Sequence, residues 1–308
     1  MIMMKKMFVI LMGILMMACG KEDETIKVGV SQIIEHPALD NTVVGFKKAL
    51  ADGGYGDIQI EVQNAQGDFA TAQTIGAAYA RDKDMILAVS TPSAQAAYNA
   101  TKDKPILITA VTDPVSAGLV GDNISGTSDA SPVDRQMELI RNLLPNAKRV
   151  GVVYNTSEQN SQILVDQMRV EAEKIGLEVV ESGVTSINEI ALALDNLLGQ
   201  VDVLYTPTDN LVVSSTPLVL EKAGERRVPV VGSIEEQVAQ GALATETIDY
   251  EKLGYQTGEM AVRILKGEDI KDMPVETLKD TKLIINRETA ERYGIDLTDE
   301  SVREATII

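Results

Sequence analysis

Residues 85–114, MILAVSTPSAQAAYNATKDKPILITAVTDP, decide the fold of this chain. They contain two apolar runs, 85–89 and 105–110, with a short Ala-rich segment between them. Continuous apolar strands joined through a helix indicate a parallel sheet that is covered on both faces. Polar residues follow both runs, and parallel sheets of this kind bind ligands outside the carboxyl ends of their strands. We therefore expect a ligand site at this edge of the sheet.

Ser93 is predicted to begin a helix over residues 94–101, directly after Pro92. The N–H groups at a helix start are unpaired and carry partial positive charge, so they favour a carboxylate or another anion. A serine at such a place is most often an N-cap. Both roles, cap and ligand contact, stay open for Ser93.

The rest of the chain repeats the alternation of strand and helix. Before residue 85 we expect a strand over 26–30, a helix over 38–52, a strand over 58–63 and a helix over 69–81. After residue 114 we expect a helix over 132–144 and strands over 149–154, 178–181, 201–205, 228–231 and 242–245. This order predicts an α/β protein with two doubly wound parallel-sheet lobes, and 308 residues are enough for two domains.

The composition excludes several kinds of function. The formal net charge of −18 argues against nucleic acid as a partner, because phosphate binding needs a basic face. The chain has one cysteine, Cys19, and one histidine, His36, so a Cys/His zinc site and an internal disulfide are both ruled out by count. We expect no metal, no cofactor and no catalytic residue.

The N-terminus has the pattern of a signal peptide that ends at a cysteine. Lys5 and Lys6 precede an apolar stretch over residues 7–17, and small residues surround Cys19. This resembles a bacterial lipoprotein signal over residues 1–18, with Cys19 lipidated and residues 19–25 as a tether. The alternatives are an ordinary signal peptide and an incidental cysteine. Met16 stands three places before the cysteine, where such signals usually have leucine.

Several motifs together resemble those of the bacterial ABC-transporter substrate-binding lipoproteins of the tryptophan/tyrosine type. The resemblance covers about residues 26–295, and its motifs are SQIIEHPALD (31–40), QNAQGD (63–68), TPSAQAA (91–97), TAVTDP (109–114), TPTDN (206–210) and GYQTG (254–258). It implies a type I periplasmic-binding-protein fold, in which two lobes joined by a three-crossing hinge close over one small ligand. The implied lobes are 26–123 with 243–272, and 124–242 with 273–299.

The resemblance implies that the ligand is an amino acid, usually an aromatic one, delivered to an ABC permease by a monomeric protein anchored outside the cytoplasm through lipid on Cys19. Ser93 and Thr112 are the candidates for binding the ligand's carboxylate, and Asp209 is the candidate for its ammonium group, because a buried charge needs a partner. Asp209 is also favoured as a helix N-cap. Tyr154 and Tyr205 are either stacking partners or core residues. The full set of expected ligand contacts is Ser31, Gln32, Glu35, His36, Thr91, Ser93, Thr112, Asp113, Asn155, Ser157, Asn160, Thr208 and Asp209.

Two other functions remain as alternatives. A sensor for another small metabolite would have the same sequence pattern. An enzyme on this scaffold is disfavoured, because the chain lacks G-x-G-x-x-G after its first strand, a P-loop and G-x-S-x-G, and has a single histidine. The acidic pair Glu235 and Glu236 is better explained as a solvated acidic face than as an acid/base pair.

Overall fold

The computed structural model describes residues 25–278 and 280–308. The predicted signal segment 1–18, Cys19 and all but the last residue of the tether lie outside the described residues. Within the described ranges, no helix combines the length and the apolar character needed to cross a membrane.

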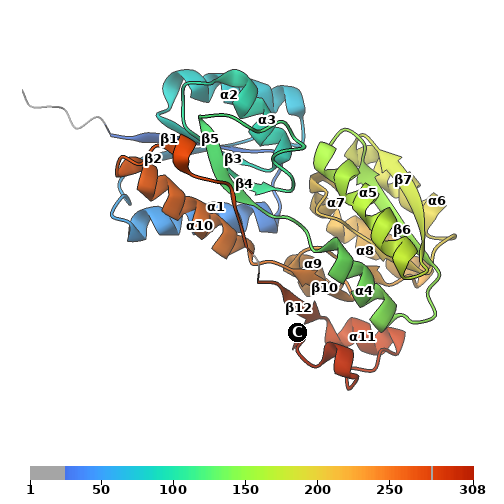
Figure 1. The fold of residues 1–308 in the computed structure, drawn as a ribbon. Coiled ribbons are helices and arrows are strands. Elements are labelled where there is room, and N and C mark those ends of the chain that lie inside the picture. The colour runs from blue at the N-terminus through green and yellow to red at the C-terminus, as the bar shows by residue number, and fades with distance from the viewer. Residues whose placement is uncertain (1–24, 279) are drawn as a thin grey trace, which may run out of the picture.

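The first lobe is built on a parallel sheet with the strand order β11-β5-β4-β3-β1-β2. Its central strands β1, β3 and β4 are almost wholly buried, as continuous apolar runs require when both faces are covered. Helices α1 (Pro37–Asp52) and α10 (Tyr250–Leu265) cover one face, and α2 (Phe69–Asp82) and α3 (Thr91–Ala100) cover the other (Figure 1). The strands are β1 (Lys27–Gln32), β2 (Gln59–Asn64), β3 (Met85–Val89), β4 (Ile106–Val111), β5 (Ile124–Ser128) and β11 (Glu276–Thr277).

The second lobe has the strand order β13-β12-β10-β9-β8-β6-β7, in which only the pair β10 and β12 is antiparallel among the described strands. Its strands are β6 (Arg149–Asn155), β7 (Glu178–Val184), β8 (Val203–Tyr205), β9 (Val230–Val231), β10 (Ala244–Thr247), β12 (Lys282–Ile285) and β13 (Thr306–Ile307). Its helices are α4 (Val133–Leu143), α5 (Gln159–Lys174), α6 (Ile190–Leu197), α7 (Asn210–Ser214), α8 (Thr216–Arg226), α9 (Glu235–Ala239) and α11 (Arg287–Tyr293).

The chain passes between the lobes three times, at places that differ from the expected boundaries. Residues 124–128 belong to the first sheet as β5, so the first crossing begins at Asp129. Strand β10 belongs to the second sheet, which moves the second crossing to residues 248–249. Strand β11 returns to the first sheet, so the third crossing lies between it and β12. The polar sequence of β5 is typical of a linker between lobes, but Ser125 and Thr127 are buried. Ser125 is hydrogen-bonded to Met273, and Thr127 is hydrogen-bonded to Thr109 and Thr257.

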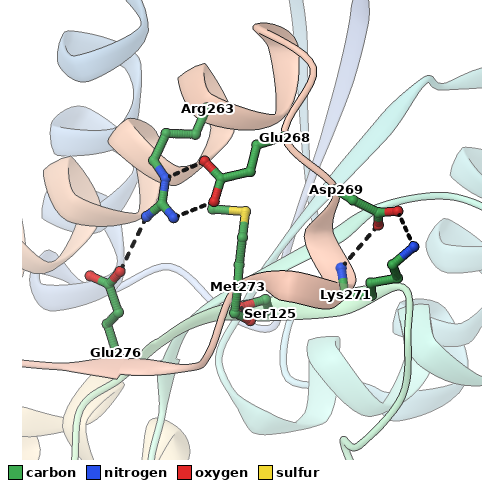
Figure 2. A network of polar contacts seen from close by, with 7 residues as sticks. All are labelled: Ser125, Arg263, Glu268, Asp269, Lys271, Met273 and Glu276. Atoms are coloured by element: carbon green, nitrogen blue, oxygen red, sulfur yellow. Dashed lines mark hydrogen bonds and ion pairs between the residues drawn. The ribbon is translucent and has the colours of Figure 1, made fainter.

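The segment that leads into β11 is held against α10 and β5 by polar contacts (Figure 2). Arg263 of α10 donates to both carboxylate oxygens of Glu268, and its third nitrogen lies 3.4 Å from Oε1 of Glu276 in β11. On the other side, the Ser125 hydroxyl donates to the carbonyl oxygen of Met273 at 2.8 Å. These contacts fix the start of the third crossing.

Helices α1 and α10 pack unusually closely because glycines line their contact. A Cβ on Gly254 would overlap the carbonyl oxygen of Thr42, and one on Gly45 would overlap that of Glu251. This close packing joins a helix from the start of the chain to one that follows the second crossing, and so completes the first lobe.

Candidate functional site

A small cavity lies between the lobes at the carboxyl ends of the strands, with a volume of about 20 Å³. Its apolar wall comes from both lobes and consists of Ala38, Leu39, Ala110, Val213 and Ile234. Its polar wall consists of His36, Thr112, Asp129, Asn160, Thr208, Asn210 and Tyr250. Asp129 and Tyr250 come directly from the first two crossings, so the cavity touches both lobes and the hinge.

Four polar atoms of this wall are buried and have no hydrogen-bond partner within residues 25–278 and 280–308. They are Nδ1 of His36, Oδ1 of Asp129, Oδ1 of Asn160 and Oγ1 of Thr208. Leaving a buried polar group unpaired costs about 1 to 3 kcal/mol. Four such atoms around one cavity indicate a place where a polar ligand supplies the missing partners.

Asp129 is the acidic residue of the cavity wall. Its Oδ2 accepts a hydrogen bond from the Tyr250 hydroxyl at 3.0 Å. Burial raises the pKa of Asp129 to about 6, against its ordinary value of 3.8. A cationic group in the cavity would stabilise the ionised form of this carboxyl group.

A second buried carboxylate, Glu158, orients the amides of the cavity. It accepts hydrogen bonds from the side-chain nitrogens of Asn155 at 3.0 Å, Asn160 at 3.2 Å and Asn210. Burial, and next the negative charge of Asp209, raise the pKa of Glu158 to about 7. Glu158 therefore fixes the direction of two amides, those of Asn160 and Asn210, that line the cavity.

Asp209 is fully buried but is not part of the cavity wall. Its Oδ1 accepts from the backbone N–H of Val212 at 2.9 Å, which makes it the N-cap of α7, and its Oδ2 accepts from the backbone N–H of Asn155 at 2.5 Å. The structure thus gives this carboxylate the capping role that was the alternative to ligand binding.

The two lobes are in contact around the cavity. Nε2 of His36 lies 3.5 Å from Oδ1 of Asn210, and both residues line the cavity. Asn41 of α1 donates to Glu236 of α9 at 2.6 Å on one side. On the other side, Gln95 of α3 donates to Gln159 of α5 at 2.9 Å. Val213 and Ile234 of the second lobe pack within the core cluster of the first lobe, so apolar contact also holds the lobes together.

The backbone is strained at the edge of the first sheet that faces the cavity. Ser90, directly after β3, has φ of 82°, and Ala110, in β4, has φ of 53°. Positive φ is uncommon for residues with a side chain and gathers at functional sites. Ala110 lines the cavity itself, which supports the prediction that this edge carries the site.

The structure places the expected ligand contacts in several environments. His36, Thr112, Asn160 and Thr208 line the cavity. The remaining residues do not: Ser31, Gln32, Thr91, Ser93, Asn155 and Asp209 are buried outside it, Glu35 and Ser157 are exposed, and Asp113 bonds to Ser116 in the following turn.

Ser93 is not the residue that precedes α3. The helix begins at Thr91, so Ser90 occupies the N-cap position and Ser93 lies in the first turn. The hydroxyls of Ser31, Ser90 and Ser93 are all buried without a partner in the described part of the chain. Of the two tyrosines left open, Tyr205 belongs to the core of the second lobe and Tyr154 packs against that core from a half-buried position.

Sequence reasoning missed four residues: Asp129, Glu158, Asn210 and Tyr250. Asp129 directly follows strand β5, so it would have been found as a polar residue at the carboxyl end of a strand had that strand been recognised in the sequence. Asn210 lies within the motif at residues 206–210. No three His, Cys, Asp or Glu side chains gather into a metal-binding group anywhere in the ranges that the structure describes.

Comparison with known proteins agrees with this architecture. The profile of a family described as "ABC transporter substrate binding protein" matches residues 27–307. A curated relative, named tyrosine-binding protein, from Clostridioides difficile strain R20291 is 53% identical over 272 residues, which are 85% of this chain and 79% of the relative. Two lobes of parallel α/β type are also the arrangement of the type I periplasmic binding proteins, as expected.

Two solved structures show the arrangement of the lobes. One is an ABC domain in complex with L-Trp from Streptococcus pneumoniae, with 37% identity, a TM-score of 0.87, and coverage of 91% of this chain and 100% of the other. The other is the ligand-free, open structure of a substrate-binding protein with adhesive properties from Clostridium difficile, with 50% identity, coverage of 92% and 99%, and a TM-score of 0.68. The present chain is therefore arranged more like the tryptophan complex, although its sequence is closer to that of the open protein.

Proposed function

Because the chain belongs to the ABC transporter substrate-binding proteins, we propose that it binds an aromatic amino acid between its lobes and delivers it to a membrane permease. The relative named tyrosine-binding protein and the structure that contains L-Trp support this class of ligand. Proteins of this family are binding subunits that act outside the cytoplasm, and their task requires no bond to be made or broken.

The unpaired oxygen of Asp129 is the observation that carries the proposal. A free amino acid brings an ammonium group, and a buried carboxylate with one oxygen left unpaired is suited to recognise it. Asp129 therefore replaces Asp209 as the proposed ammonium partner, because both oxygens of Asp209 already accept backbone N–H groups.

The other walls match the chemistry of the rest of such a ligand, which enters when the lobes separate and widen the cavity. Leu39, Val213 and Ile234 offer an apolar surface to a ring, and Tyr250 is the aromatic residue of the wall. Thr112 lines the cavity and stays a candidate for the carboxylate. Ser93 also stays a candidate, since its hydroxyl lies unpaired in the first turn of α3, where backbone N–H groups favour an anion.

Closure of the lobes is the proposed mechanism. A ligand that contacts both lobes and the hinge favours the closed form by the difference between its affinities for the two forms. The permease then recognises the closed form. Hinge residues at the crossings absorb the movement while each lobe stays rigid.

Anchoring at the membrane through lipid on Cys19 is part of the proposal. Replacing Cys19 with serine in the full chain should release the protein from the membrane fraction without changing its affinity for the ligand. Retention of the Cys19→Ser protein in that fraction would contradict the anchor and leave ligand binding unaffected. The purified protein is expected to sediment as a monomer.

Ligand binding is tested by calorimetric titration and thermal unfolding of residues 20–308 with the twenty amino acids. A ligand at 100 times its dissociation constant adds about 2.7 kcal/mol to the free energy of unfolding. We expect this shift with tyrosine or tryptophan, its loss in Asp129→Asn and its retention in Asp134→Asn, a matched change at an exposed site nearby. Binding of none of the aromatic amino acids would refute the proposed ligand.

A further inference from the structure

His36 is the only histidine of the chain, and its imidazole lines the ligand cavity and contacts an asparagine of the opposite lobe. Its Nε2 lies 3.5 Å from Oδ1 of Asn210, while its Nδ1 is buried beside the cavity without a partner in the described ranges. Which of the two nitrogens carries the proton decides whether the cavity presents a donor or an acceptor at this place.

Glu158 decides which way the Asn210 amide points. Oε2 of Glu158 accepts from the side-chain nitrogen of Asn210 and lies 3.4 Å from its backbone nitrogen. Because the amide nitrogen of Asn210 faces this carboxylate, its carbonyl oxygen faces His36. Nε2 of His36 must then be the donor in this contact.

The remaining nitrogen of His36 is consequently an acceptor. Burial lowers the pKa of His36 to about 4, so at neutral pH the ring carries one proton only. With that proton on Nε2, Nδ1 presents a lone pair to the cavity. Asn160, which also lines the cavity, likewise offers an acceptor. Its amide nitrogen donates to Glu158, Ser161 and Thr208, and its side-chain oxygen has no partner in the described ranges.

We propose that His36 determines ligand specificity by accepting, at Nδ1, a hydrogen bond from the side chain of the ligand, and that Glu158 and Asn210 are positioning residues that make Nδ1 an acceptor. This inference rests on the proposed function, in which Asp129 takes the ammonium group. The side chain must then supply a donor, as the phenol of tyrosine and the indole N–H of tryptophan do. Phenylalanine has no such group and leaves Nδ1 unpaired.

The first test uses the wild-type protein labelled with ¹⁵N in histidine, whose two ring nitrogens give the only imidazole signals of the chain. At pH 8, above the pKa of about 7 of Glu158, we expect the proton on Nε2, and we expect the Nδ1 resonance to move when tyrosine or tryptophan binds and not when phenylalanine binds. Phenylalanine should bind about 10- to 100-fold more weakly than tyrosine, as expected when a buried polar group loses its partner.

The second test uses the Glu158→Gln substitution to exchange donor and acceptor in the contact between Asn210 and His36. The glutamine amide brings its own donor, so the Asn210 amide turns, its nitrogen faces His36, and the ring proton moves to Nδ1. Tryptophan, which only donates, should then lose about tenfold or more in affinity, while tyrosine, whose hydroxyl also accepts, should lose less. Glu173→Gln, a matched change on the exposed part of α5, should change neither affinity.

The outcomes separate this inference from the proposed function. A proton on Nδ1 in the wild type, or phenylalanine binding within about threefold of tyrosine, would overturn the role of His36 and leave the aromatic ligand in place. Binding of none of the three amino acids would overturn both. Should the Glu158→Gln protein not fold, the wild-type spectra and the three affinities decide the question without it.

Discussion

The side-chain nitrogen of Gln95 lies 2.9 Å from Oε1 of Gln159, and this hydrogen bond joins α3 of the first lobe to α5 of the second. Gln159 also donates to the carbonyl oxygen of Ser116, so one side chain holds two points of the first lobe. Neither glutamine lines the cavity. The pair therefore stabilises the closed form without being a ligand contact.

Replacing Gln159 with alanine should weaken ligand binding about five- to 150-fold, because it removes two neutral hydrogen bonds, each of which contributes about 0.5 to 1.5 kcal/mol to the closed form alone. Calorimetric titration with the ligand measures the loss. Gln162→Ala is the matched control, since Gln162 lies on the same helix and bonds to Thr156 within its own lobe. Equal affinities for the two variants would show that this contact does not stabilise closure.

Ligand affinity should rise with pH up to about pH 6 and then level off. The carboxyl group of Asp129 has a pKa of about 6 in the ligand-free protein, because burial favours its protonated form. Pairing with an ammonium group lowers that pKa, so below pH 6 a proton must leave before the ligand binds. The affinity should fall by up to about tenfold for each pH unit below this value.

Titrations with the ligand between pH 4.5 and 8 measure this slope. Asp129→Asn should bind weakly at every pH and lose the slope. Glu158, with a pKa of about 7, and His36, with a pKa of about 4, keep their titrations in that variant, so any slope that persists belongs to them. An unchanged slope in Asp129→Asn would contradict the proposed ammonium partner.

The same substitution should stabilise the protein that has no ligand. A carboxyl group whose pKa is raised on folding contributes stability below its unfolded value of 3.8, and this contribution is lost as the pH rises through about 6. At pH 8 the wild-type protein must bury the ionised carboxylate of Asp129, whereas the asparagine that replaces it carries no charge. Asp129→Asn should therefore raise the free energy of unfolding by about 1 to 3 kcal/mol at pH 8 and leave it nearly unchanged at pH 4. Denaturant unfolding at both pH values measures this, and equal stabilities at pH 8 would contradict the burial of an ionised group.

The sheets were predictable because apolar runs such as residues 85–89 encode strands that are buried on both faces, and those strands form as expected. The crossings were less predictable. Strand β5 has the sequence ISGTS, and the hydroxyls of Ser125 and Thr127 find partners in distant segments such as Met273 and Thr257. A single sequence does not reveal such long-range pairing, so residues 124–128 were placed outside the first lobe although they form a strand of its sheet.

The site was predictable as an edge of the sheet rather than as a set of side chains. His36 and Asn160 were expected from their place after a strand, and both line the cavity. Asp209 and Glu158 lie in similar polar segments of the sequence, but their hydrogen-bond donors differ. The carboxylate of Asp209 accepts from backbone N–H groups, and that of Glu158 accepts from asparagine side-chain amides. The partner that a buried carboxylate finds depends on packing between segments about 50 residues apart, such as Asn155 with Asp209.

The contact between α1 and α10 should tolerate no side chain at Gly254. A Cβ there would overlap the carbonyl oxygen of Thr42, and backbone atoms of a packed helix cannot move aside without separating the two helices. Gly254→Ala should therefore lower the free energy of unfolding by about 2 to 3 kcal/mol, measured by denaturant titration.

Gly224→Ala on α8 is the matched control, because a Cβ at that exposed helical position meets no atom within 4 Å. It should raise the free energy of unfolding by about 0.5 to 1 kcal/mol, since alanine favours a helix more than glycine does. Stabilisation of similar size in both variants would show that helix propensity, and not the close contact of the two helices, governs position 254.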